Sequence, residues 1–141
     1  MAPFAERLAA ARRVARHPRI LVSDLEDRIA TRYTRDTVAY LTAMLPNVAF
    51  VWLMGADNLG QLPRWQSWTR IFESLPIAVF ARSTYSLKVL SGKAAKRYAT
   101  SRLPDRAAGR LAERTPPAWV FLHTRLNPAS ASSIRGRQAA S

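Results

Sequence analysis

The sequence has no cysteine and only 5 glycines. The lack of cysteine excludes disulfides, thiolate metal sites and a cysteine nucleophile, and it suits the reducing cytoplasm, where we expect the protein. No glycine-rich phosphate loop of the Walker type is present. No apolar run approaches about 18 residues, so we expect no membrane-spanning helix.

Basic residues outnumber acidic ones by 22 to 9, which gives a net charge of +13. One interpretation is a nucleic acid or another polyanion as partner. The other is composition, because 19 of the 22 basic residues are arginine and they are spread along the chain. We favour composition together with a phosphate-rich small ligand, and we expect no nucleic-acid partner.

Apolar segments of strand length alternate with segments of helical spacing. Strands are predicted at residues 20–22, 48–54, 76–80 and 118–122. Helices are predicted at residues 3–16, 34–45, 86–102 and 104–114, and from residue 63 onward. Because the strands are apolar on both faces, we predict an α/β fold with a parallel sheet covered by helices on both sides. The length of 141 residues fits a single domain, and we expect residues 136–141 to fray.

The carboxyl ends of parallel strands are where such sheets bind ligands. The loops after Met54, Phe80 and His123 are therefore candidates. Gly55 allows a ligand or another backbone to come close, and Asp57 can accept hydrogen bonds from a ribose. Residues 55–58 also suit a plain turn capped by the aspartate.

A second candidate lies at the predicted helix start near Pro63. Thr34 begins another helix, as its N-cap. Free N–H groups at a helix start bind anions such as carboxylates, and Trp65 can stack on an aromatic ring. The alternative is that Trp65 packs into the core, as we expect for Trp68 and Phe72.

A third candidate combines hydroxyls with an arginine near the end of the chain. Ser130, Ser132 and Ser133 precede Arg135, and such a group can clamp phosphate oxygens. The alternative is a disordered, serine-rich tail. Neither histidine, His17 nor His123, has the neighbours of a metal or catalytic site, so we nominate no metal ligand and no catalytic residue.

Several motifs occur together in a fixed order. They are RLA (7–9), HPRI (17–20), Glu26, RYTRDT (32–37), FVWLMGADNL (50–59), WQSW (65–68) and SASSIR (130–135). In this combination the chain resembles bacterial nicotinate-nucleotide adenylyltransferases over nearly its whole length.

The resemblance implies a Rossmann-like nucleotidyltransferase fold and a role in NAD biosynthesis. The family transfers AMP from ATP to nicotinate mononucleotide and releases deamido-NAD and pyrophosphate, using Mg²⁺. Arg82 corresponds to the arginine of a family Arg-Pro-Gly segment. The nicotinate-binding residues implied are Tyr33, Thr34, Trp65 and Gln66. The ATP-binding residues implied are Gly55, Asp57, Ser130, Ser132, Ser133 and Arg135.

The chain departs from the family at its start. The family opens with a strand, a Gly-x-Phe-x-Pro-x-His-x-Gly-His loop, a helix and a second strand, and none of these is in the sequence. The histidines of that loop stabilise charge on the transferred phosphate. We therefore expect a fold that lacks these elements. The alternative function is a noncatalytic remnant that acts at most as a nucleotide-binding domain.

The 141-residue chain alone is predicted not to transfer AMP at a useful rate. Losing one preorganised donor to a developing oxyanion typically costs about 10²–10³ in rate, and the whole loop is missing here. The measurement is pyrophosphate release from ATP with nicotinate mononucleotide and Mg²⁺, beside a version extended by in-frame upstream sequence. Comparable turnover by both proteins would contradict the prediction.

Overall fold

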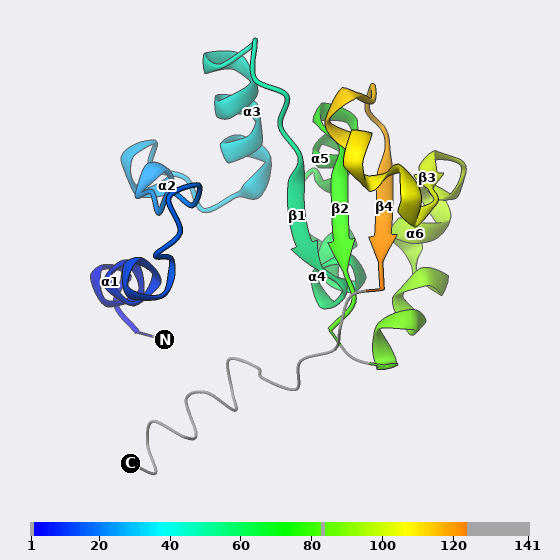
Figure 1. The fold of residues 1–141 in the computed structure, drawn as a ribbon, viewed down its shortest axis with the longest axis horizontal. Helices are drawn as coiled ribbons and strands as arrows, with labels where there is room; N and C mark the ends of the chain where they lie inside the picture. Colours follow the sequence, from blue (N-terminus) through cyan, green and yellow to red (C-terminus); the bar gives the residue numbers. More distant parts are fainter. Residues whose placement is uncertain (1, 83, 124–141) are drawn as a thin grey trace.

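A four-stranded parallel sheet organises the protein, for which the computed structural model describes residues 2–82 and 84–123. The strand order is β1-β2-β4-β3, and every pair is parallel. The arrows of β1, β2 and β4 run side by side in Figure 1. This confirms the predicted α/β fold with a parallel sheet. The strands are β1 (Trp52–Gly55), β2 (Ile77–Phe80), β3 (Arg102–Leu103) and β4 (Trp119–Leu122).

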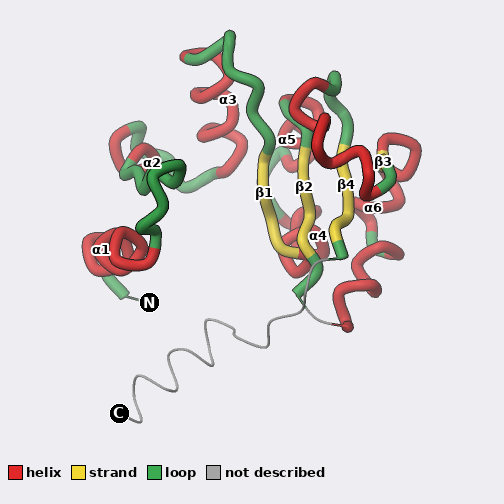
Figure 2. The backbone as a smooth tube through the Cα atoms, in the orientation of Figure 1, coloured by secondary structure: helices red, strands yellow, loops and turns green. Residues whose placement is uncertain are grey.

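Helices occupy most of the remaining described chain (Figure 2). None of those in the described part is long and apolar enough to span a bilayer. The α-helices are α1 (Phe4–Val14), α2 (Leu25–Arg28), α3 (Thr34–Met44), α4 (Ala56–Gln61), α5 (Trp68–Ser74) and α6 (Lys93–Arg97). The 3₁₀ helices are η1 (Leu62–Arg64), η2 (Thr84–Ser91), η3 (Ala99–Ser101) and η4 (Asp105–Glu113).

Both faces of the sheet are covered by packed side chains. Successive side chains along each strand point to opposite faces, so each strand contributes to both cores. Ile77 and Val79 of β2 point to one face, where they join residues of α3, α4, α5 and α6 in the larger core. Ala78 of β2 and Val120 of β4 point to the other face and pack with Leu111 of η4. The continuous apolar composition of these strands follows from this double burial.

Stacked aromatic rings form the centre of the larger core. Phe72 of α5 stacks on Tyr98 with ring centroids 4.2 Å apart, and it meets Trp119 of β4 edge-on at 6.2 Å. Trp119 donates its indole N–H to the Tyr98 carbonyl at 2.8 Å, so its one polar atom is satisfied. Burial raises the pKa of the Tyr98 hydroxyl above its ordinary value.

The first long strand is shorter than predicted. Residues 48–54 were expected to be extended throughout, but β1 begins at Trp52, whose N–H donates to the carbonyl of Pro76 at 2.9 Å. Val48 precedes the region where β2 offers partners, and it is 48% exposed. Within the described sheet β1 is an edge strand, and Leu53 on its η4 side is 62% exposed.

Three other predictions need correction. Residues 20–22 form no strand; Leu21 is 92% exposed and has no partner strand. The helix predicted over residues 86–102 is broken at Gly92 and after α6, and it ends in the unpredicted strand β3. Residues 104–114 form a 3₁₀ helix instead of an α-helix. These short elements depend on tertiary neighbours, which local spacing does not reveal.

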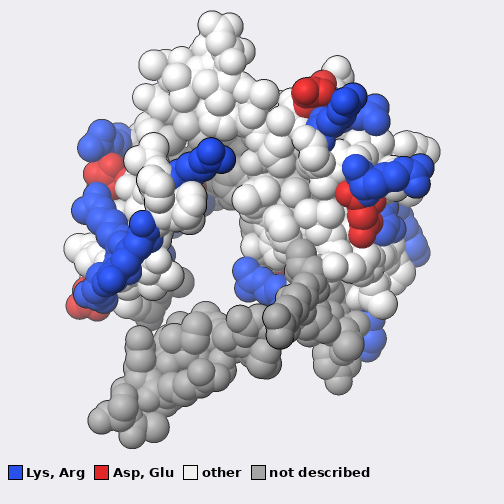
Figure 3. Space-filling view, in the orientation of Figure 1, with Lys and Arg blue, Asp and Glu red and all other residues white. Residues whose placement is uncertain are grey.

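Charged side chains are distributed in separate groups on the face drawn in Figure 3. Basic side chains lie over α1 and α2 and again over η4, with acidic side chains beside each group. On this face the basic groups do not merge into one stripe.

Replacing Phe72 by alanine is predicted to lower the free energy of unfolding by about 3–5 kcal/mol, because it leaves a cavity against Tyr98 and Trp119. Phe4→Ala is the matched control, since Phe4 is 40% exposed on α1. It should change stability by less than about 0.5 kcal/mol. Urea denaturation followed by circular dichroism measures both values, and equal losses would contradict the assignment of the core.

Candidate functional site

Two pockets contain residues that the sequence singled out. The first, the Gly55 pocket, lies where β1 and β2 end, because their register pairs Gly55 with Phe80. It has a volume of about 380 Å³. It is lined by Leu53, Met54, Gly55, Asn58, Phe80 and Arg82.

Gly55 permits close packing inside this pocket. Its backbone, at φ −76° and ψ 159°, is open to any residue. A Cβ at position 55, however, would lie only 2.6 Å from Nε of Arg82. Glycine is therefore needed here for the approach of the Arg82 side chain, which extends across the end of β1.

The residues after Gly55 form helix α4, so the alternative of a plain turn is wrong. Asp57 is exposed in the first turn of α4 and does not line the Gly55 pocket, whereas Asn58 does. The sequence prediction missed Asn58. The sequence signal that could have found it was its side-chain amide, because Asn58 directly follows the predicted site residue Asp57 near a strand end.

The second pocket, the Trp65 pocket, brings together Tyr33, Thr34, Trp65 and Gln66, all four residues implied in nicotinate binding. It has a volume of about 420 Å³. Residues 32–35 form one side, called here the α3 wall. Residues 64–66 form the other side, called the η1 wall, and Ile71 of α5 completes the lining. α3 packs beside α5, which follows the η1 wall in the chain, so both walls line the same pocket.

The η1 wall differs from the predicted helix. No helix runs from Pro63 through Trp68; instead η1 ends at Arg64, and Trp65 is extended at φ −79° and ψ 144°. Ser67 is left-handed at φ 52°, and α5 starts at Trp68. Trp65 is half-buried, packing against the larger core while it also lines the pocket. Packing against the core is thus confirmed for Trp65, and stacking on a ligand ring stays a prediction.

Helix α3, which carries the α3 wall, begins one residue earlier than predicted. Tyr33 is the N-cap of α3, and Thr34 is its first helical residue, so the predicted Thr34 cap is wrong. The Thr31 hydroxyl accepts the Tyr33 N–H at 3.1 Å and donates to Asp36 at 2.8 Å. The N–H groups of Asp36 and Thr37 donate to the Tyr33 carbonyl, which leaves those of Thr34 and Arg35 at the start of α3. Both residues line the pocket, where a helix start favours an anion.

Three arginines that the sequence prediction did not select also line the Trp65 pocket. Arg32 and Arg35 belong to the α3 wall and Arg64 to the η1 wall. Their positive charges add to the potential of the helix start, so the pocket suits an anionic ligand with an aromatic ring. Each of these arginines is adjacent in sequence to a predicted site residue. Nothing in the spacing, however, distinguishes them from the other arginines among the 19 in the chain.

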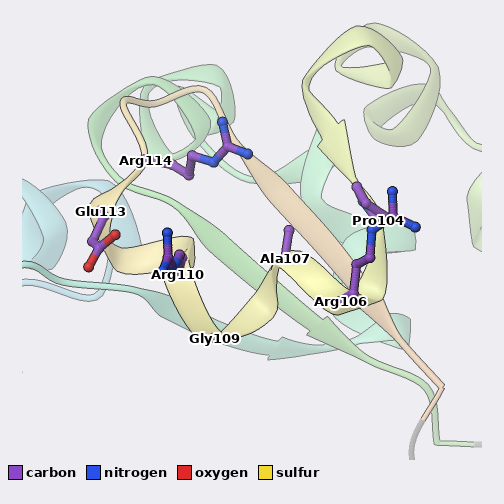
Figure 4. Close-up of a pocket in the computed structure, with 7 residues that line it drawn as sticks. All are labelled: Pro104, Arg106, Ala107, Gly109, Arg110, Glu113 and Arg114. Carbon is purple, nitrogen blue, oxygen red and sulfur yellow. The ribbon is translucent and has the colours of Figure 1, made fainter.

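A larger hollow lies elsewhere in the part of the chain that the structure describes. It has a volume of about 1020 Å³ and lies along η4 (Figure 4). Arg106, Arg110 and Arg114 line it, and Figure 4 shows their guanidinium groups spread along the hollow rather than converging. No predicted site residue contributes to it, so size alone does not identify the site.

Part of the predicted ATP site lies outside the described residues. These are Ser130, Ser132, Ser133 and Arg135. Within residues 2–82 and 84–123 no group of three His, Asp or Glu side chains is placed to hold a metal ion.

The all-parallel sheet, helices on both faces and a pocket at the strand ends define a Rossmann-like α/β protein. No protein-family model matches the chain. Individual proteins do match it, and each of the following is named probable nicotinate-nucleotide adenylyltransferase. One from Cereibacter sphaeroides is 48% identical over 134 residues, covering 95% of this chain and 71% of the relative. One from a Caulobacter strain is 48% identical over 136 residues, covering 96% and 72%. One from a Bradyrhizobium strain is 52% identical over 119 residues, covering 84% and 62%.

The chain therefore belongs to the nicotinate-nucleotide adenylyltransferase family, a group of nucleotidyltransferases. This confirms the family resemblance inferred from the motifs and the Rossmann-like nucleotidyltransferase fold. The chain spans about 71% of the length of the Cereibacter relative.

Gly55→Ala is predicted to displace the Arg82 side chain without unfolding the protein. The new Cβ would meet only the flexible end of Arg82, and the backbone angles suit alanine, so stability should change by less than about 1 kcal/mol. The Nε–H resonance of Arg82 should shift. Gly109→Ala is the matched control, because beyond its chain neighbours and its own helix backbone no heavy atom of the described residues lies within 4 Å of its added Cβ. An unchanged Arg82 resonance in Gly55→Ala would contradict the close packing.

Proposed function

We propose that the Trp65 pocket binds the nicotinate ring of nicotinate mononucleotide and that the Gly55 pocket takes part in binding ATP. The observation that carries the proposal is the meeting of Tyr33, Thr34, Trp65 and Gln66 in one pocket of a chain from this family. Trp65 offers a ring for stacking. The start of α3 and three nearby arginines favour the negative charge of the nicotinate carboxylate.

The reaction proposed is the transfer of AMP. A phosphate oxygen of nicotinate mononucleotide attacks the α-phosphorus of ATP, and a new P–O bond forms. The bond from that phosphorus to the bridging oxygen of the β-phosphate breaks, so deamido-NAD and pyrophosphate leave. Such transfers depend mainly on positioning and on stabilisation of phosphate charge.

ATP is the proposed second substrate, and it would arrive as its magnesium complex. Mg²⁺ keeps much of its coordination from water and substrate phosphates, so a dedicated cage of carboxylates is not required. Arg82, at the end of β2, is suited to bind a phosphate through its guanidinium. The proposed ATP site also includes Gly55, Asp57 and the clamp at residues 130–135.

A noncatalytic nucleotide-binding domain is the alternative function. It would share both pockets and differ only in turnover. Binding of nicotinate mononucleotide and ATP without pyrophosphate release would favour it, whereas release of pyrophosphate would favour the enzyme.

Trp65→Ala is predicted to weaken binding of nicotinate mononucleotide by about 1–3 kcal/mol, on the scale of base–aromatic stacking. ATP binding should change little, because Trp65 does not line the Gly55 pocket. Isothermal titration calorimetry with each ligand measures both effects, and Trp65→Phe should keep most of the affinity because it keeps an aromatic face. Equal loss for ATP and nicotinate mononucleotide would identify Trp65 as a core residue, and absence of nicotinate mononucleotide binding by the unaltered chain would overturn the proposed function.

A further inference from the structure

Arg35 connects the α3 wall to Ser67, the residue that directly follows the η1 wall. Its Nη1 donates to the Ser67 hydroxyl at 2.9 Å, although the two residues are 32 positions apart in the sequence. Its Nε donates to Asp36 at 3.2 Å. The side chain is 25% exposed, so both bonds are partly shielded from water. Hydrogen bonds made by a charged group in such surroundings are stronger than those between neutral groups.

The hydrogen bonds continue into the backbone of the α3 wall. Asp36 accepts the Thr31 hydroxyl with its other carboxylate oxygen at 2.8 Å. The Thr31 oxygen in turn accepts the N–H of Tyr33 at 3.1 Å. A continuous series of hydrogen bonds therefore runs from Tyr33 through Thr31, Asp36 and Arg35 to Ser67. The Arg35 guanidinium also lies 5.4 Å from the centre of the Tyr33 ring.

The series of hydrogen bonds ends at Ser67, where the backbone conformation depends on support from neighbouring residues. Ser67 adopts φ 52° and ψ 41°, the left-handed region, which is unfavourable for a residue other than glycine. Ser67 directly follows Trp65 and Gln66 and precedes α5. Its conformation therefore determines how the η1 wall turns back into the helix. A hydrogen bond that fixes the Ser67 side chain helps to hold this turn and, with it, the Trp65 ring.

We propose that Arg35 is a positioning residue that holds Trp65 in place for the nicotinate ring by joining the α3 wall to Ser67. The family resemblance gives Arg35 no role. Two of its donors are directed to Ser67 and Asp36. Besides adding positive charge to the pocket, it therefore acts on the ligand through the turn that follows the η1 wall. The inference rests on the proposed function for the identity of the ligand, but the position of the Trp65 ring can be tested without any ligand.

The first measurement uses the indole N–H resonances of the 4 tryptophans in the ligand-free 141-residue chain. Trp65→Phe identifies the Trp65 signal. Arg35→Met and Ser67→Ala should each shift or broaden it. The Trp119 signal should stay unchanged, because that indole is bonded to Tyr98 in the core. Arg70→Met is the matched control, since Arg70 is exposed on α5 and does not line the pocket. It should leave both signals unchanged.

The second measurement is the affinity for nicotinate mononucleotide. Arg35→Met and Ser67→Ala should each weaken it about tenfold, the scale of one hydrogen bond to a charged group. The double variant should be no weaker than Arg35→Met alone, because Arg35→Met has already removed the bond to Ser67. Arg35→Lys keeps the charge and a donor, so it should recover part of the affinity. It also serves as the second variant if Arg35→Met folds poorly.

Three results would overturn the proposal. One is an unchanged Trp65 signal in Arg35→Met. Another is a Trp119 signal that moves as much as that of Trp65, which would show a general effect on folding. The third is weakened binding in Arg35→Met with none in Ser67→Ala, which would make Arg35 a direct ligand of the carboxylate. If the unaltered chain binds no nicotinate mononucleotide, the proposed function fails, whereas the Trp65 signal still tests the role of Arg35.

Discussion

The described structure depends on strand β2, because β2 is bonded on both edges and buried on both faces. It pairs residue for residue with β1 on one side and β4 on the other. Its side chains alternate between the larger core and the smaller core under η4. Moving β2 by one residue would exchange the two sets of side chains, so its register is strongly specified. The same register brings the ends of β1 and β2 to one level, where the Gly55 pocket lies.

The sheet was largely predictable because its physical signal is local. An apolar run between turn residues is sufficient to indicate a buried strand, and β2 and β4 were predicted close to their observed bounds. The start of β1 was not predictable, because the strand begins only where Pro76 supplies an acceptor. Strand β3 and the 3₁₀ form of several predicted helices were missed for the same reason. Their conformation depends on neighbours that are distant in sequence.

The candidate site was predictable in its residues more than in its geometry. The motifs indicated Tyr33, Thr34, Trp65 and Gln66, and the fold brings them into one pocket. The sequence did not reveal that Trp65 lies in an extended segment before a left-handed Ser67, because nothing in the local pattern requires that turn. Long-range bonds such as that between Arg35 and Ser67 depend on how α3 packs against α5. Spacing along the chain cannot show them.

Helix α1 contains no buried residue, and neither does the short helix α2 that follows it. Opening such a helix exposes little apolar surface, so its cost in free energy is far below that of unfolding the sheet. Amide hydrogens of α1 will therefore exchange with solvent through local fluctuations, while those of β2 exchange only when the whole core opens. We therefore expect the cooperative unit of the described chain to be the sheet with α3 to α6 and η4, with α1 outside it.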